Sequence, residues 1–289
     1  MTRFLQEAWP FVVIAIVALG VFRLVFNRLT PYDDSKVKQG GSKAAKAAAI
    51  TRWGAYIGYV TATMGSLVMS DQPYWYDVMM FGLDSVVALV VFSAAYYAID
   101  LTMLRRINNA AEIEKGNIAV AKVEFCGYVG LGIIMNASFA GGGDQSLVSG
   151  MLNAALFSVV ALVTLMVAYT VYTIGWAIRG CNLDDQILRG SRAAAIEAGS
   201  LLLALSVALW FSIVGDFEGW SEDLASYGKA AALSIAAVSV SRAAASLLMF
   251  KLGRTRKGAH HGNMTKAVVV GLVSIIAGAI AGLLFYTYL

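Results

Sequence analysis

Charged residues, prolines and cysteines are all scarce in this chain of 289 residues. Only 14% of the residues are charged, 59% are hydrophobic and three are prolines, a composition outside the range of soluble globular domains. The two cysteines, Cys126 and Cys181, fall in an apolar run and in a basic loop respectively, so we expect no disulfide. These shortages exclude a soluble or disulfide-stapled domain and indicate a polytopic membrane protein.

Signatures of catalytic and cofactor sites are also missing from the sequence. It contains no Walker loop, dinucleotide fingerprint, zinc-ligand spacing or nucleophile elbow. The two histidines, His260 and His261, are adjacent in a basic loop, and such neighbours rarely hold a metal without further ligands. An intramembrane enzyme would need a nucleophile paired with a base, and we find none. We therefore expect no enzymatic activity, no cofactor, no metal and no nucleic-acid partner.

Long apolar runs fill most of the chain. About 20 apolar residues form a helix that crosses a hydrocarbon core roughly 30 Å thick. Helices are favoured because strict alternation is absent and a backbone in lipid must satisfy its own hydrogen bonds. The first run lacks a convincing cleavage site and is expected to be retained. The predicted fold is all-α, with eight transmembrane helices near residues 9 to 27, 47 to 69, 78 to 103, 118 to 140, 147 to 178, 193 to 214, 225 to 250 and 266 to 288.

Basic residues are distributed unevenly among the predicted loops. Sixteen of the 22 Lys and Arg residues fall in the loops after the first, third, fifth and seventh spans. The loops after the second, fourth and sixth spans contain acidic residues and no basic ones. Because basic loops stay in the cytoplasm, we expect both termini to be extracytoplasmic. Topology alone explains the basic loops, or they also bind anionic lipid or an acidic cytosolic protein.

A short motif recurs at the start of every even-numbered span. Each copy is a glycine followed by serine or asparagine, at spacings of 75, 74 and 72 residues. The four copies are Gly41-Ser42, Gly116-Asn117, Gly190-Ser191 and Gly262-Asn263. The period indicates four repeated two-helix hairpins, in two membrane halves at residues 1–143 and 144–289. We expect the polar side chain to cap the helix while the glycine makes a tight turn; anion binding at these helix starts is the alternative.

One copy of the motif resembles a known family. The stretch "EIEKGNIAVAKVEFCGYVGLGI" is similar to the core of the domain-of-unknown-function 350 family of bacterial inner-membrane proteins, which have paired transmembrane helices around an acidic Gly-Asn-x-Ala-x-Ala start. The resemblance is closest over residues 111 to 135, weaker over 183 to 205 and faint in the first and last units. It implies tandem copies, a location in the bacterial inner membrane and a role in the cell envelope, and it implies no reaction.

Several charged residues fall inside the predicted spans, at the cytoplasmic half. A charge at the centre of a membrane helix costs about 2.5 to 3.5 kcal/mol, so we expect these side chains to be paired. In particular, Glu124 and Glu197 are each expected to face the interior beside a cation. The residues of this candidate set are Arg52, Asp100, Lys122, Glu124, Glu197 and Arg242. They form either interhelical pairs that fix helix register or a polar cavity open to the cytoplasm.

Small residues spaced four apart are concentrated on the even-numbered spans. Such pairs allow two helix backbones to approach closely, whereas the odd-numbered spans favour Val, Leu, Phe and Tyr. The pairs are Gly54 and Gly58, Cys126 and Gly130, Ala194 and Ala198, and Gly278 and Gly282. The even-numbered helices are therefore expected to occupy the centre of the protein.

Two functions follow from these observations. The first is an integral inner-membrane protein that moves ions or small solutes through a polar cavity facing the cytoplasm. The alternative is a non-transporting scaffold that docks anionic lipid or cytosolic partners on its basic loops. The bilayer is a partner in both cases, and both are compatible with a homo-oligomer.

Overall fold

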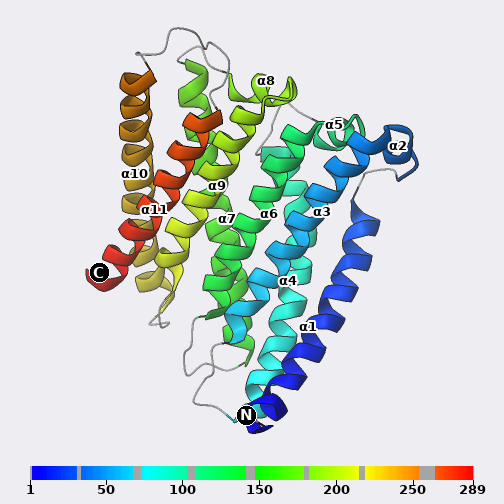
Figure 1. Cartoon of the computed structure of the whole chain (residues 1–289). Helices are drawn as coiled ribbons and strands as arrows, with labels where there is room; N and C mark the ends of the chain where they lie inside the picture. The colour runs from blue at the N-terminus through cyan, green and yellow to red at the C-terminus, as the bar shows by residue number, and fades with distance from the viewer. Residues whose placement is uncertain are drawn as a thin grey trace.

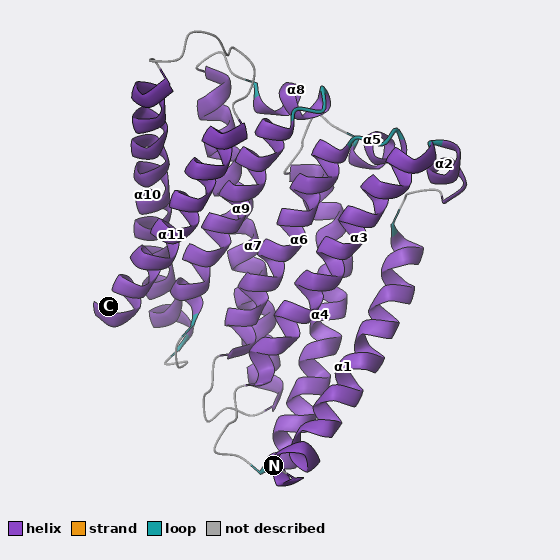
Figure 2. Cartoon of the chain, viewed as in Figure 1, coloured by secondary structure: helices purple, strands orange, loops and turns teal. Residues whose placement is uncertain are grey.

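The described part of the chain forms eight long helices, with short helical elements between some of them. The computed structural model describes residues 2–30, 34–67, 73–102, 108–140, 147–178, 182–214, 219–253 and 264–288, and the regular structure within them is helical (Figure 2). The long helices are α1 (Thr2–Leu29), α3 (Gly41–Thr63), α4 (Tyr74–Thr102), α6 (Ile118–Ala140), α7 (Leu147–Ile178), α9 (Arg192–Ile213), α10 (Trp220–Gly253) and α11 (Met264–Tyr288). The short elements are α2 (Asp34–Gln39), α5 (Asn109–Glu114), α8 (Leu183–Leu188) and the 3₁₀ turn η1 (Met64–Leu67).

Seven of the long helices in the described ranges are long and apolar enough to cross a membrane: α1, α4, α6, α7, α9, α10 and α11. The predicted span at residues 47 to 69 corresponds to α3, which is not among them. The described helix begins earlier than predicted, at Gly41, and so includes Lys43 and Lys46 in its first two turns. These lysines, together with Arg52 and several glycines and threonines, lower its apolar character. Length and composition thus support seven of the eight predicted spans.

The even-numbered spans of the prediction form a continuous row. Helices α3, α6, α9 and α11 stand side by side, with α4 and α7 behind them and α1 and α10 at the two edges (Figure 1). In the most apolar stretches of α6 and α9, 67% and 56% of the residues are buried, against 11% in α1. The expectation that these helices occupy the centre is therefore confirmed for α6 and α9.

Glycines set the spacing within this row. A Cβ atom on Gly58 of α3 would overlap the backbone carbonyl of Tyr128 on α6, and one on Gly132 would overlap the backbone of Gly58. A Cβ on Gly199 of α9 would lie 2.6 Å from the sulfur of Cys126. Similar contacts at Gly278 join α11 to α9. The predicted close approach of the small-residue helices is confirmed.

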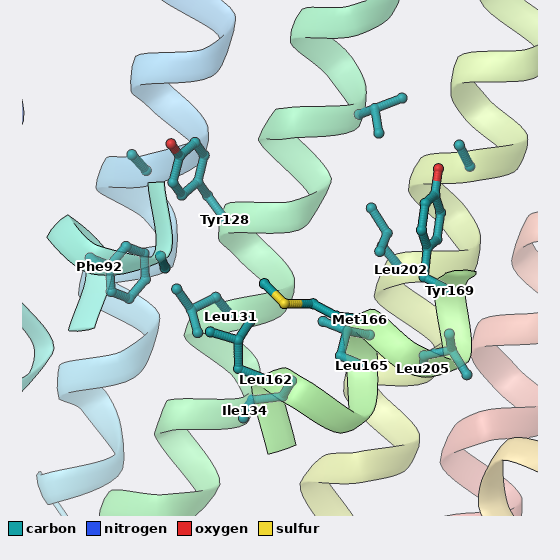
Figure 3. Packing of buried hydrophobic residues seen from close by; sticks show 14 of the residues in the cluster. Phe92, Tyr128, Leu131, Ile134, Leu162, Leu165, Met166, Tyr169, Leu202 and Leu205 are labelled. Atoms are coloured by element: carbon teal, nitrogen blue, oxygen red, sulfur yellow. The ribbon is translucent and has the colours of Figure 1, made fainter. Parts of the chain in front are cut away.

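Large apolar side chains fill the space behind the row. Phe22 of α1 stacks on Tyr59 of α3, with ring centroids 4.3 Å apart, and Phe92 of α4 lies at the edge of both rings. Further along, side chains of α6, α7 and α9 gather in one cluster (Figure 3). Its labelled members include Leu131, Ile134, Leu162, Leu165, Met166, Leu202 and Leu205. This packing attaches α4 and α7 to the back of the row.

Three short helices lie together at one end of the bundle. Figure 1 shows α2, α5 and α8 at this short-helix end, and both termini at the other. Each short helix is followed by a glycine with positive φ: Gly41 at 73°, Gly116 at 86° and Gly190 at 77°. Glycine adopts this conformation at little cost, so each glycine lets the chain turn from a short helix into a long one.

The turns after α5 and α8 have the same hydrogen bonds. Gly116 N–H donates to Ile113 O at 2.9 Å and Asn117 N–H donates to Glu112 O at 2.9 Å. In the other turn, the corresponding distances for Gly190 and Ser191 are 2.9 and 3.0 Å. This pattern is the Schellman ending of a helix. The glycine of the motif therefore ends a short helix that the sequence analysis did not predict.

The residue after the glycine begins the next helix in two of the three copies that the structure describes. Asn117 Oδ1 accepts from Ala119 N–H at 3.0 Å, and Ser191 Oγ accepts from Ala194 N–H at 3.3 Å, as expected for caps. The prediction was wrong for Ser42, because α3 already begins at Gly41 and its N-cap is Gly40. Gly262 and Asn263 lie outside the described residues.

A substitution at Gly58 tests the close approach of α3 and α6. Gly58→Ala should destabilise the protein by about 1–3 kcal/mol, because the new methyl group must separate the two backbones. Thermal unfolding in detergent measures the change. Gly82→Ala is the matched control, since a Cβ at Gly82 would have nothing within 4 Å, and it should be neutral or slightly stabilising. Equal effects of the two substitutions would contradict the packing.

Candidate functional site

A buried arginine on α10 connects four helices. Arg242 is 2% exposed. Its guanidinium reaches Tyr172 on α7, Glu197 and Ser200 on α9, and Ser274 on α11. We call these five residues the Arg242 cluster.

The geometry of the Arg242 cluster uses all three guanidinium nitrogens. Arg242 Nη2 donates to the main-chain oxygen of Glu197 at 3.1 Å and lies 3.4 Å from its carboxylate Oε1. Nη1 donates to Ser200 Oγ at 3.4 Å and to Ser274 Oγ at 3.3 Å. Nε donates to Tyr172 Oη at 3.1 Å, and Cζ lies 5.3 Å from the centre of that ring. The cluster thus combines an ion pair, hydrogen bonds and a cation–π contact.

The Arg242 cluster holds four helices in a fixed register. A buried guanidinium is costly unless its charge and its N–H groups are matched. Here the partners come from α7, α9 and α11, so the charge is stabilised only while all four helices keep their register. The Glu197 side chain remains 18% exposed, which leaves one edge of the cluster open to its surroundings.

Of the predicted set, Glu197 and Arg242 form an ion pair. Glu124 lies in the middle of the bundle on α6 and is 1% exposed, and Lys122 on the same helix is half-buried. Arg52 lies on α3 and lines a groove at the edge of the bundle. Asp100 is in α4, and its side chain lies outside the described part of the chain.

Three members of the Arg242 cluster were not predicted from the sequence. Tyr172, Ser200 and Ser274 are polar residues in apolar runs, where serine is common in membrane helices. A signal for Ser200 was present, because it follows Glu197 by three residues and therefore shares its helix face. Nothing in the sequence pattern points to Tyr172 or Ser274, since their helices meet α10 only in the folded protein.

The groove that contains Arg52 opens between α1, α2 and α3. Its volume is about 580 Å³. Arg23 of α1, Lys38 of α2 and Arg52 of α3 supply its cations, beside apolar and aromatic residues. The residues that line this α1–α3 groove are Leu19, Arg23, Asn27, Val37, Lys38, Ala45, Ala48, Ala49, Arg52, Trp53 and Tyr56.

Asn117 joins the two halves of the protein at the short-helix end. Besides capping α6, it donates through Nδ2 to the main-chain oxygens of Ile187 at 3.3 Å and Leu188 at 3.0 Å, both in α8. The same amide group donates to Glu112 Oε2 at 3.1 Å. The capping residue of the motif is therefore also an interhelical contact, which its position in the sequence did not reveal.

Glu112 is held in its charged form by this contact. Partial burial disfavours its carboxylate, but hydrogen bonds from Lys115 and Asn117, and the Lys115 charge, outweigh that effect and keep the pKa of Glu112 below its ordinary value. The ionised group therefore stabilises the fold above the pKa of an unfolded glutamate. That contribution is lost as the pH falls through the lowered pKa.

The comparison with known families agrees with this arrangement of two halves. Residues 2–139 and 146–284 match the family described as Domain of Unknown Function (DUF350). The chain belongs to the DUF350 family. The expected tandem copies are thus confirmed, with α1 to α6 in the first DUF350 copy and α7 to α11 in the second.

A curated relative supports the membrane location of this DUF350 protein. Over 123 residues the chain is 25% identical to the UPF0719 transmembrane protein of Aquifex aeolicus (strain VF5). The match covers 43% of this chain and 44% of the relative, which is less than half of either protein. No solved structure matches the chain. The apolar helices and the relative together establish an integral, multi-pass membrane protein.

The Arg242 cluster predicts a strong coupling between two substitutions. Arg242→Met or Glu197→Gln alone should cost about 3–5 kcal/mol, because each leaves the other group without its partner. The double variant should lose less than the sum, with a coupling of about 1–3 kcal/mol. This double-mutant cycle is measured by thermal unfolding of the wild type, the two single variants and the double variant in one detergent.

Arg192 supplies the control for this cycle. It is exposed in the first turn of α9, so Arg192→Met and Glu197→Gln should be additive. Additive effects of the Arg242 and Glu197 substitutions would show instead that the ion pair does not fix the helices.

Proposed function

We propose that this DUF350 protein is a non-transporting membrane scaffold whose short-helix end docks anionic lipid or an acidic partner. The observation that carries the proposal is the α1–α3 groove, which includes Lys38 of α2 at that end and is lined by three cations from three helices. A cationic surface at the membrane interface attracts anionic headgroups and acidic proteins. In this proposal the remainder of the bundle is a rigid frame that positions the surface.

The packing of the inner row favours a scaffold over a channel. Backbone contacts at glycines bring α3, α6, α9 and α11 close together, and such contacts leave little room for water between these helices. The guanidinium of Arg242 is occupied by partners on α7, α9 and α11. A group whose hydrogen bonds are all taken up within the protein is poorly placed to bind a passing ion.

Transport of an ion or small solute is the second candidate function. The partial exposure of Glu197, next to a buried cation, is the feature that favours it, because a solute path needs an accessible polar group. Such a path would continue along the buried carboxylate of Glu124 on α6.

We also propose that α3 crosses the membrane as the eighth span. It lies against α6 through Gly54 and Gly58, and the following turn η1 continues this contact through Gly65. Helix α6 is itself apolar enough to span. The spacing of α2, α5 and α8, each followed by a positive-φ glycine, supports a repeat of a two-helix unit within each membrane half.

The orientation that we propose places the short-helix end in the cytoplasm of a bacterial inner membrane and both termini outside. The bias of Lys and Arg toward the loops at that end supports it. A reporter that is active only in the cytoplasm should be inactive when fused after Leu289, and active when inserted after Gly190. The opposite pattern would reverse the orientation.

Ion flux separates the two candidate functions. The full chain reconstituted in liposomes should pass no K⁺, Na⁺, H⁺ or Cl⁻ above the rate of empty liposomes when a membrane voltage is applied, because the described inner helices are closely packed. An added ionophore verifies that the voltage is present. Flux that exceeds the background and falls in the Glu197→Gln variant would contradict the scaffold and favour transport.

A further inference from the structure

We propose that the α1–α3 groove binds the phosphate headgroup of an anionic phospholipid. This inference rests on the proposed function, because it names the ligand at the short-helix end. It assigns that ligand to one groove of the first DUF350 copy, not to the basic loops as a whole.

The cations of the groove are of the kinds that bind phosphate. Arg23 and Lys38 are exposed and Arg52 is half-buried, and all three line the same space of about 580 Å³. A guanidinium binds two oxygens of a phosphate through paired N–H groups, and a lysine adds a mobile point charge. Three such groups from three helices can therefore surround one headgroup.

The described lining of the groove is free of groups that repel an anion. Among the described residues that line the groove there is no Asp or Glu. Tyr56 Oη donates to Asn27 Oδ1 at 3.1 Å, across the gap between α3 and α1. The NH₂ group of Asn27 is a further donor group in the same lining. The groove thus presents N–H donors beside its cations.

The apolar part of the groove favours a lipid over free phosphate. Leu19 and Trp53 line it, and Trp53 is 62% exposed, as expected for a tryptophan at a membrane interface. Leu24, beside Arg23, is 70% exposed on a helix that faces lipid. Acyl chains would lie against these side chains, whereas inorganic phosphate has nothing to place there.

The depth of the groove also suits a headgroup. Arg23 lies six residues before the end of α1 at Leu29, which is about 9 Å at 1.5 Å per residue. A side chain of this length extends toward the interface while its stem stays in the apolar layer. The guanidinium is then near the level of the lipid phosphates.

Competition between two lipids tests the proposal. The purified full chain is mixed with equal amounts of phosphatidylglycerol and phosphatidylcholine, and native mass spectrometry counts the lipids bound. The groove variant is Arg23→Gln, Lys38→Gln, Arg52→Gln. The control variant is Lys115→Gln, Arg189→Gln, Arg192→Gln, which removes the same charge from exposed positions at the same end, outside the groove.

We expect the wild type to prefer phosphatidylglycerol and the groove variant to lose on the order of tenfold in apparent affinity for it. The control variant should keep most of the preference. Ala49→Trp fills the groove and retains every charge, so it should reduce lipid binding as well. This variant still tests the site if the triple variant does not fold. Equal losses in the groove and control variants, or unchanged binding by Ala49→Trp, would overturn the site.

Two further results keep this inference separate from the proposed function. Inorganic phosphate at millimolar concentration should not displace the lipid, and displacement would assign the groove to a free anion instead. A wild type without any preference would remove both the groove site and lipid docking at this end. Ion flux with an intact lipid preference would overturn only the scaffold and leave the groove assignment standing.

Discussion

The close approach of helix backbones in the inner row determines how the rest of the protein is built. At Gly58 and Gly132 the backbones of α3 and α6 meet without an intervening side chain. Lipid supplies no hydrophobic force between membrane helices, so contacts of this kind and interhelical hydrogen bonds must hold the row together. Asn136 of α6 provides two such bonds, since it donates to Thr61 O on one side and accepts from Trp210 Nε1 on the other, both at 2.9 Å. The row is therefore held through contacts with both neighbours of α6.

Tight packing also explains where this protein tolerates polar and charged groups. A helix needs an apolar surface only where it faces lipid, and α3 faces α6 along one side. The glycines on that side are therefore compatible with a place in the membrane, although they and the cations of α3 lower its apolar character below that of the other long helices. The same holds for Arg242 inside the bundle. The free-energy cost of burying its charge is offset by partners on three neighbouring helices and not by water.

Sequence patterns predicted the elements whose signal lies within one helix. The bounds of α6 and α7 agree with the predicted spans, since long apolar runs end sharply there, and Asn117 was correctly expected to be a cap. The short helices were missed because six residues are too few to show a helical period. The partners of Arg242 and the contact from Asn117 to α8 could not be predicted either. They depend on the rotation of each helix about its axis and on residues some seventy positions away.

The two DUF350 copies share an arrangement of helices but place their buried or half-buried arginines differently. Both contain a short helix followed by a glycine with positive φ, at Gly41 or Gly190, and the long helices that follow occupy the inner row. In the first copy, Arg52 lines a groove at the edge of the bundle together with Arg23 and Lys38. In the second copy, the guanidinium of Arg242 is paired with Glu197 and bound by neighbouring side chains. A cation cannot both lock four helices and bind an outside anion, so a tandem protein can assign rigidity to one copy and recognition to the other.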